Sequence, residues 1–275
     1  MSNPKQLLEQ HDITPKKSLG QNFLNDPNAL EKIISIAELN PDDTVLEIGA
    51  GTGALTEKLA QHAKRVVAVE VDERLFPILG AQMRPYPHVE LHLADILTID
   101  LHQVMGDDPY VVVANVPYYI TSAILRHLLE TIHRPTKLIM TIQTEVAERV
   151  VAKPPDMSVL AVSVQFYGKP DIATRFNPAI FYPRPEVGSA VLRVITYDTP
   201  PVAVPSEALF FCVVRAGFGQ KRKQLKNALS GNLAITSDQA SQLCQSAGID
   251  PMRRAETLTL DEWASLTRAF AERER

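Results

Sequence analysis

The stretch that decides the fold is TVLEIGAGTGAL, residues 44–55. Its first five residues, 44–48, form a mostly apolar run typical of a strand in a parallel sheet. Glycines follow at positions 49, 51 and 53, and an amphipathic helical pattern begins near Ala54. A strand, a glycine turn and a helix together bring the backbone close to a bound nucleotide. The stretch therefore predicts the first unit of a nucleotide-binding α/β sheet.

The glycines alone leave the kind of nucleotide open. Gly49, Gly51 and Ala54 also satisfy the dinucleotide pattern G-x-G-x-x-A, which nicotinamide enzymes share. The next predicted strand, 65–69, runs into Glu70, about 20 residues after the first glycine, where an acid can accept hydrogen bonds from both ribose hydroxyls. This spacing favours a ribose-containing cofactor.

A carboxylate follows the third predicted strand, 89–93, in the sequence Ala94-Asp95-Ile96. An acceptor next to an apolar side chain suits an adenine ring, which needs a partner for its amino group and a surface for its face. The competing interpretation is that Asp95 only caps a helix or a loop.

The fourth predicted strand, 110–114, leads into Asn115-Val116-Pro117-Tyr118. An amide oxygen, a backbone carbonyl and an aromatic ring then stand at the carboxyl end of a strand, where open α/β sheets bind ligands. The set suits a flat heteroaromatic ring with an exocyclic amino group. A simple strand-ending turn is the alternative, because Asn and Pro favour turns.

Two segments outside this core are expected to border the site. Residues 15–24 contain Lys16, Lys17 and a flexible glycine, and form either a basic arm or a loop that closes over the ligand pocket. Residues 159–166 and 189–195 read as two paired strands at a sheet edge. The proline-rich segment between them presents Phe181, expected to stack opposite Tyr118 unless it merely packs under the loop.

A linker rich in proline, 197–206, precedes a region with helical patterns only. It holds the densest basic run of the chain, around residues 215–226, and a second basic pair at 253–254. Basic runs are often only solvated faces, but the interleaved Phe218 and glycines favour contact with nucleic-acid phosphates. The residues expected to contact nucleic acid are Lys16, Lys17, Arg215, Lys221, Arg222, Lys223, Lys226, Arg253 and Arg254.

The composition limits the class of protein. The chain has 275 residues, of which 45% are hydrophobic and 22% charged, as in ordinary globular domains. A net charge of −4 means that any nucleic-acid site is a local patch. Cys212 and Cys244 lack metal-ligand spacing, no apolar run reaches the roughly 18 residues of a membrane span, and no signal peptide is evident. We therefore expect a cytoplasmic protein without metal or membrane contact.

These motifs, in their order, resemble class I S-adenosylmethionine-dependent methyltransferases that act on an adenine amino group. Four further segments extend the resemblance to nearly the whole chain: GQNFL at 20–24, FYPRPEVGS at 181–189, GFGQKRKQLKNAL at 217–229 and RRAETLTLDEW at 253–263. Together they are similar to the bacterial small-subunit (16S) ribosomal RNA adenine dimethyltransferase family. One departure is GQKRK, where many members have two arginines before the lysine; both cations remain.

The resemblance implies a Rossmann-like α/β sheet with helices on both faces and a small all-α C-terminal domain. It divides the chain into an arm over 1–26, a methyltransferase domain over 27–199 and an RNA-contacting domain over 200–275. The implied substrate is 16S rRNA in an immature small subunit, dimethylated at N6 of two adjacent adenosines in the 3′-terminal hairpin loop by a monomer. The implied catalytic residues are Asn115, Pro117, Tyr118 and Phe181. The residues implied for S-adenosylmethionine, and for its product S-adenosylhomocysteine, are Asn22, Leu24, Gly49, Gly51, Glu70, Asp95, Ile96 and Asn115.

Four other functions share parts of this pattern. A large-subunit RNA dimethyltransferase shares the core motifs but lacks the segment at 253–263. A DNA adenine methyltransferase would need a module that reads duplex DNA. An assembly factor on a methyltransferase scaffold would not need Asn115 and Tyr118, and a nicotinamide dehydrogenase would need a catalytic His or a Lys/Tyr pair.

Overall fold

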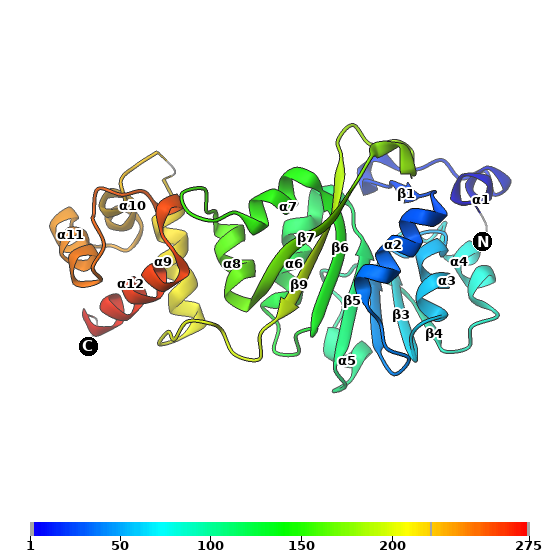
Figure 1. Cartoon of the computed structure of the whole chain (residues 1–275), viewed down its shortest axis with the longest axis horizontal. Helices are drawn as coiled ribbons and strands as arrows, with labels where there is room; N and C mark the ends of the chain where they lie inside the picture. The colour runs from blue at the N-terminus through cyan, green and yellow to red at the C-terminus, as the bar shows by residue number, and fades with distance from the viewer. Residues whose placement is uncertain (1–2, 221, 274–275) are drawn as a thin grey trace. The chain divides into compact units, whose positions relative to one another are not determined.

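The computed structural model describes residues 3–220 and 222–273 (Figure 1). The chain divides into two compact units, one formed by residues 1–147 and 170–196 and the other by 148–169 and 197–275. The second unit thus includes a segment, 148–169, that the sequence assigned to the methyltransferase domain. Lys221, one of the predicted RNA-binding residues, lies outside the described residues.

A seven-stranded sheet has the order β4-β3-β2-β5-β6-β9-β7. The strands, in that order, are Val89–Leu93, Arg65–Glu70, Thr44–Ile48, Tyr110–Asn115, Lys137–Gln143, Ser189–Thr196 and Gly168–Phe176. The first five are parallel, and β9 runs antiparallel to β6. The chain turns outward in opposite directions from β2, first to β3 and later to β5, so the sheet has a topological switch point between β2 and β5.

The register of these strands brings their carboxyl ends to one edge. Ile48 of β2 is paired with Val69 of β3 on one side and with Ala114 of β5 on the other. The glycine turn, Glu70 and Asn115, which each follow one of these residues, therefore emerge next to one another. Neighbouring residues along β2 and β5 are buried irrespective of which face they point to, because helices cover both faces of the sheet.

The helices of the first unit are α1 (Pro4–Gln10), α2 (Pro27–Ala37), α3 (Ala54–Ala60), α4 (Phe76–Met83), α5 (Leu101–Met105) and α6 (Thr121–Leu129). Helix α2 starts at Pro27, and the carboxylate of the preceding Asp26 accepts hydrogen bonds from the backbone of Asn28 and Ala29. The apolar faces of α2 and α3 pack on the sheet around Val45 and Val113.

The prediction of a strand over 159–166 is wrong. These residues form helix α8 (Val159–Tyr167), whose first turn is capped by the Ser158 hydroxyl at 3.1 Å from the Ala161 nitrogen. A short, mostly apolar run such as this one, broken only by Ser163 and Gln165, is buried equally well as a strand or as a helix, so its periodicity does not separate the two. The strand beside β9 is instead β7, the less apolar segment that follows.

The second unit is helical. It contains α8, α9 (Glu207–Phe218), α10 (Leu225–Asn232), α11 (Ser237–Ser246) and α12 (Leu260–Arg273), and the division between units falls within α7 (Thr144–Val151). Its core is aromatic: the ring of Phe166 stacks on Phe210 at 4.6 Å, and Trp263 stacks on Phe218 at 5.5 Å. The predicted combination of a Rossmann-like sheet and an all-α C-terminal region is confirmed.

Candidate active site

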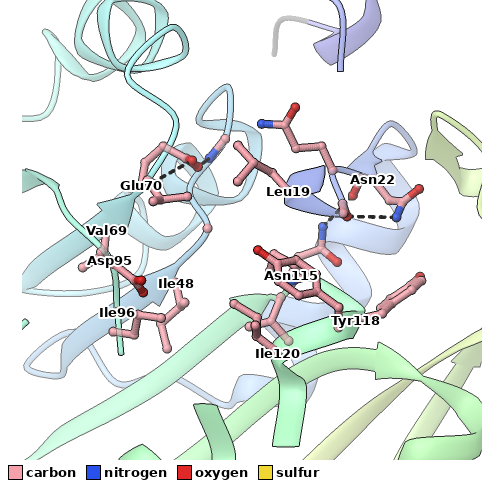
Figure 2. Close-up of a pocket in the computed structure, with 18 of the residues that line it drawn as sticks. Leu19, Asn22, Ile48, Val69, Glu70, Asp95, Ile96, Asn115, Tyr118 and Ile120 are labelled. Atoms are coloured by element: carbon pink, nitrogen blue, oxygen red, sulfur yellow. Dashed lines mark hydrogen bonds between the residues drawn. The ribbon is translucent and has the colours of Figure 1, made fainter. Parts of the chain in front are cut away.

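A cavity of about 300 Å³ lies at the carboxyl edge of the sheet, next to the switch point (Figure 2). The ends of β2, β3, β4 and β5 line it, and residues 19–23 of the N-terminal arm border it. Nine predicted site residues are among its walls: Asn22, Gly49, Gly51, Glu70, Asp95, Ile96, Asn115, Pro117 and Tyr118. Figure 2 shows Glu70 and Asp95 on one side of the cavity and Asn115 with Tyr118 on the other.

Glu70 is held by three backbone N–H groups. One carboxylate oxygen accepts from Gly51 at 2.7 Å, and the other accepts from Val71 at 2.9 Å and Asp72 at 2.8 Å. Burial raises the pKa of this carboxyl group, and the three hydrogen bonds oppose that rise. An ionised carboxylate offers about four acceptor positions, so Glu70 can still accept from a ribose hydroxyl.

The turn requires glycine, because its backbone is left-handed and closely packed. Because its glycines carry no side chain, the turn also leaves room for a ligand. Gly51 has φ +60°, and a Cβ atom there would lie 3.1 Å from the ring of Phe23. A larger residue would strain the turn and displace the N–H that binds Glu70. The turn therefore fits the role of a cofactor cradle, as its sequence indicates.

Asp95 and Ile96 provide the polar and apolar walls expected of an adenine site. Ile96 is buried, whereas Asp95 is exposed and accepts a hydrogen bond from the Leu97 nitrogen at 2.9 Å on one oxygen. The other carboxylate oxygen remains able to accept from an amino group.

Asn115 is oriented by the arm. Its side-chain nitrogen donates to the backbone carbonyl of Asn22 at 2.9 Å. This bond fixes which end of the amide is the nitrogen, so the side-chain oxygen is the atom left for an incoming donor. The predicted role of Asn115 as acceptor for an amine requires a free amide oxygen of this kind, and that role stays a prediction.

Pro117 and Tyr118 continue the same wall. The Pro117 carbonyl accepts from the Thr121 hydroxyl at 3.3 Å and from the Ile120 nitrogen at 3.4 Å, two long bonds at the start of α6. The hydroxyl of Tyr118 is 2.6 Å from that of Ser189, a buried residue on β9, and burial raises the pKa of Tyr118. The bond to Ser189 anchors the far end of the ring.

The arm is fastened across the cavity by Asp72, a residue that the sequence analysis did not single out. Its carboxylate is buried and accepts from the side chains of Gln21 at 2.8 Å and Arg74 at 2.6 Å, while Lys16 lies 3.8 Å away. Arg74 also donates to the Thr14 carbonyl at 3.1 Å. The Arg74 guanidinium is the main cause of the lowered pKa of Asp72, about 2. An acid two positions after Glu70 was the available signal.

Glu47 is the second polar residue that the sequence did not assign to the site's structure. It is 1% exposed and borders a small hollow, about 30 Å³, together with Gly49 and Asn115. One of its carboxylate oxygens has no hydrogen-bond partner among residues 3–220 and 222–273. Burial raises the pKa of Glu47 to about 8.

Two predicted site residues point elsewhere. Phe181 is 4% exposed and belongs to the hydrophobic core around α2, and its strand β8 (Phe181–Tyr182) pairs with β1 (Phe23–Leu24) of the arm. The ring does not border the main cavity, because this pairing turns it inward. Leu24 is likewise in the core, although it borders the small hollow beside Asn115.

The predicted RNA-binding residues fall into two groups. Arg215, Arg222, Lys223 and Arg254 are exposed, as are Lys16 and Lys17, and Lys226 is half-buried. Arg253 is different: its guanidinium pairs with Glu262 and donates to the Thr257 hydroxyl at 3.1 Å. That side chain is engaged inside the helical unit.

The part of the chain that the structure describes, residues 3–220 and 222–273, forms neither a metal-binding cluster nor a membrane-spanning helix. No group of three or more His, Cys, Asp or Glu side chains there is arranged to hold a metal ion. None of the helices there is both long and apolar enough to cross a bilayer.

The sheet order, the glycine cradle, the ribose-type acid and the Asn-Val-Pro-Tyr wall together define a class I S-adenosylmethionine-dependent methyltransferase. The family model for ribosomal RNA adenine dimethylase matches residues 13–272. The chain is 43% identical to ribosomal RNA small subunit methyltransferase A of Dehalococcoides mccartyi strain CBDB1, over 98% of this chain and 94% of that protein. It is 44% identical to the protein of the same name from Geobacillus kaustophilus strain HTA426, over 97% and 94%.

Solved structures agree. The 23S rRNA methyltransferase ErmE has a TM-score of 0.72 at 26% identity, over 91% of this chain and 100% of that one. A dimethyladenosine transferase from Plasmodium falciparum shares the fold, with a TM-score of 0.78 at 22% identity, over 92% and 98%. The chain belongs to the ribosomal RNA adenine dimethylase family, and the predicted activity, methyl transfer from S-adenosylmethionine to adenine of ribosomal RNA, is confirmed at that level.

Proposed function

We propose that this protein methylates N6 of two adjacent adenosines in the 3′-terminal hairpin loop of 16S rRNA, twice each, within an immature small subunit. It acts in the cytoplasm as a monomer. The observation that carries the proposal is the orientation of Asn115 by Asn22, which leaves an amide oxygen beside the cofactor cavity to receive an amine. The small-subunit names of relatives at 43–44% identity favour this RNA over large-subunit RNA.

The walls of the cavity fit S-adenosylmethionine. Glu70 and the glycine turn suit the ribose, Asp95 and Ile96 suit the adenine, and Asn22 borders the same space. When bound, this cofactor supplies a methyl group that is already activated on a sulfonium. The protein therefore has to orient the acceptor rather than to generate a strong nucleophile.

The Asn115 side-chain oxygen and the Pro117 carbonyl hold the two N6 protons of the target. An aromatic amine is a poor nucleophile because its lone pair is delocalised into the ring, and holding both protons lets the nitrogen pyramidalise. Tyr118 stacks on the base and keeps it in line. These effects are positioning and electrostatics, which can supply most of such a rate acceleration. The base enters by flipping out of a loop, which costs less than leaving a duplex.

Labelled S-adenosylmethionine tests the proposal. The protein is incubated with undermethylated small subunits, large subunits or DNA, and the labelled nucleoside is identified by mass spectrometry. Dimethyladenosine at two neighbouring positions of small-subunit RNA is the expected product. Label confined to large-subunit RNA would assign the chain to the activity for which ErmE is named.

A further inference from the structure

A second hollow, of about 750 Å³, opens beside the catalytic motif. It is lined by Tyr119, Ser122, Ala123, Arg126, His127, Glu130 and Thr131, all on or next to α6 and within the first compact unit. Tyr119 lines this hollow and the cofactor cavity alike. Tyr119 follows Tyr118 in the motif and borders both spaces, so the hollow and the cofactor cavity are contiguous there. A nucleic-acid strand that leaves the cavity past Tyr118 would meet Tyr119 next.

Tyr119 is an unusual residue for a solvent-facing position. Its side chain is among the few large hydrophobic groups that are strongly exposed, at 62%. One edge of the ring rests on the arm: a Cβ atom at Gly20 would lie 3.1 Å from Cδ1 and 3.4 Å from Cε1 of Tyr119. The ring is thus supported on one edge and open elsewhere, which is the state of a stacking platform before its ligand arrives.

Arg126 supplies a cation to the same hollow. Its Nε atom is 3.3 Å from a carboxylate oxygen of Glu130, and the side chain is largely exposed. A guanidinium carries five N–H donors, so this single ion pair leaves donors for a phosphate. The hollow therefore combines an aromatic face with a cation, the two groups with which proteins bind single-stranded nucleic acid.

We propose that this hollow holds the nucleotide adjacent to the target adenosine, with its base on Tyr119 and its phosphate at Arg126. The inference rests on the proposed function, under which that neighbour is the second adenosine of the pair. Tyr118 and Tyr119 then hold two successive nucleotides: one base is methylated while the other waits on the neighbouring ring.

The test compares Tyr119→Ala and Tyr119→Phe with the wild type on undermethylated small subunits. Tyr119→Ala is expected to raise KM for the subunit about 5- to 100-fold, the range that one stacked base is worth. Because Tyr119 also borders the cofactor cavity, KM for the subunit is compared at saturating S-adenosylmethionine, with Kd for the cofactor of each variant measured by calorimetry. Tyr119→Phe retains the stacking face and is expected to behave as the wild type.

A substrate change completes the cycle. Small subunits are reconstituted with an abasic residue in place of the neighbouring nucleoside. The wild type should then lose as much as Tyr119→Ala loses on intact subunits, and the variant should lose nothing further. Equal losses for both proteins, or an unchanged KM in Tyr119→Ala, overturn the inference and point instead to a surface for ribosomal protein.

Two controls separate the outcomes. If the wild type leaves intact small subunits unlabelled, the proposed function fails as a whole, whereas failure in Tyr119 alone leaves that function standing. If Tyr119→Ala does not fold, Arg126→Gln is tested in its place. The slope of log K for subunit binding against log salt concentration is expected to fall by about one in this variant. An unchanged slope overturns the phosphate contact.

Discussion

The polar residues at the carboxyl edge of the sheet are held by hydrogen bonds, whereas the exposed Arg222 and Lys223 of the helical unit are not held by ion pairs in the described part of the chain. At the sheet edge, Glu70 is bound by three backbone N–H groups and Asn115 by one backbone carbonyl. In the helical unit, Arg222 and Lys223 are exposed, and within residues 3–220 and 222–273 no ion pair engages them. The first region is built before its ligand arrives, and the second offers charge without fixed geometry.

The contrast teaches where substitutions should act. Pre-formed hydrogen bonds position reacting atoms, so their loss should appear in the rate or in cofactor affinity. Exposed cations contribute a screened attraction, so their loss should appear in the salt dependence of RNA binding. Five substitutions sharpen or break this distinction, in descending order of effect.

Asn115→Ala should have the largest effect. Loss of the amide oxygen removes an acceptor for the N6 protons, and single-turnover transfer should slow by about 10²- to 10³-fold, as for other lost electrostatic contacts. Cofactor binding, followed by calorimetry, should weaken only slightly. Transfer at the wild-type rate would exclude the proposed amine contact.

Asp72→Asn tests the fastening of the arm. The neutral side chain cannot hold Arg74, Lys16 and Gln21 together, so Kd for S-adenosylmethionine should rise about tenfold, the worth of one charge-assisted hydrogen bond. The rate at saturating cofactor should change little. Glu73→Gln, the same charge change on the exposed neighbour, is the matched control and should leave Kd unchanged.

Glu47→Gln should change the pH dependence of stability. The pKa of Glu47 is about 8 in the folded chain against 4.5 ordinarily. Its carboxyl group therefore costs the wild type no stability below about pH 4.5, and it lowers the free energy of unfolding progressively as the pH rises from there toward 8. The variant lacks this loss. Its advantage should grow from pH 5 to pH 8 by at least about 1.4 kcal/mol, the worth of one pKa unit. Hydrogen exchange of β2 in the cofactor-free protein measures this difference in stability. A difference that does not vary with pH would contradict the raised pKa of Glu47.

Arg253→Ala should destabilise the helical unit by about 1 kcal/mol, since it breaks a half-exposed network rather than a surface pair. The fluorescence of Trp263, the single tryptophan and fully buried in this unit, reports the unfolding. Arg254→Ala is the control, because its pair with Glu256 is long, at 3.9 Å, and exposed. Equal effects in both variants would remove the distinction between the two arginines.

Lys223→Ala should give the smallest change. Binding to small subunits should weaken a few-fold at low salt, and the slope against salt should fall by about one, with stability unchanged. Lys32→Ala, an exposed lysine on α2, should leave the slope as it is. A rate defect at saturating subunit in Lys223→Ala would show that this surface is also geometrically fixed.

The residues at the sheet edge could be predicted from the sequence because the carboxyl ends of neighbouring parallel strands lie at the same edge of a sheet. Once strands 44–48, 65–69 and 110–114 are recognised, their register brings Gly49, Glu70 and Asn115 together without further information. The residues that support them were harder to find. Asp72 binds Gln21 across 51 positions of sequence, and its place two residues after Glu70 marks it as a candidate without indicating that partner.

Aromatic and apolar residues were the least predictable. Phe181 was expected to present its ring to the base, but its pairing with the arm places it in the core. Residues 159–166 were expected to form an edge strand because they alternate enough for one, but they form helix α8, since a short, mostly apolar run fits either element. Tyr119, next to a recognised motif, is distinguished only by its exposure, a property of the fold rather than of the residue type.

The bond between Asn22 and Asn115 joins two events that are usually separate. The arm that borders the proposed cofactor cavity also orients the Asn115 amide, the group proposed to receive the amine. A displacement of the arm at Asn22 would therefore change the orientation of Asn115 as well as the wall of the cofactor cavity.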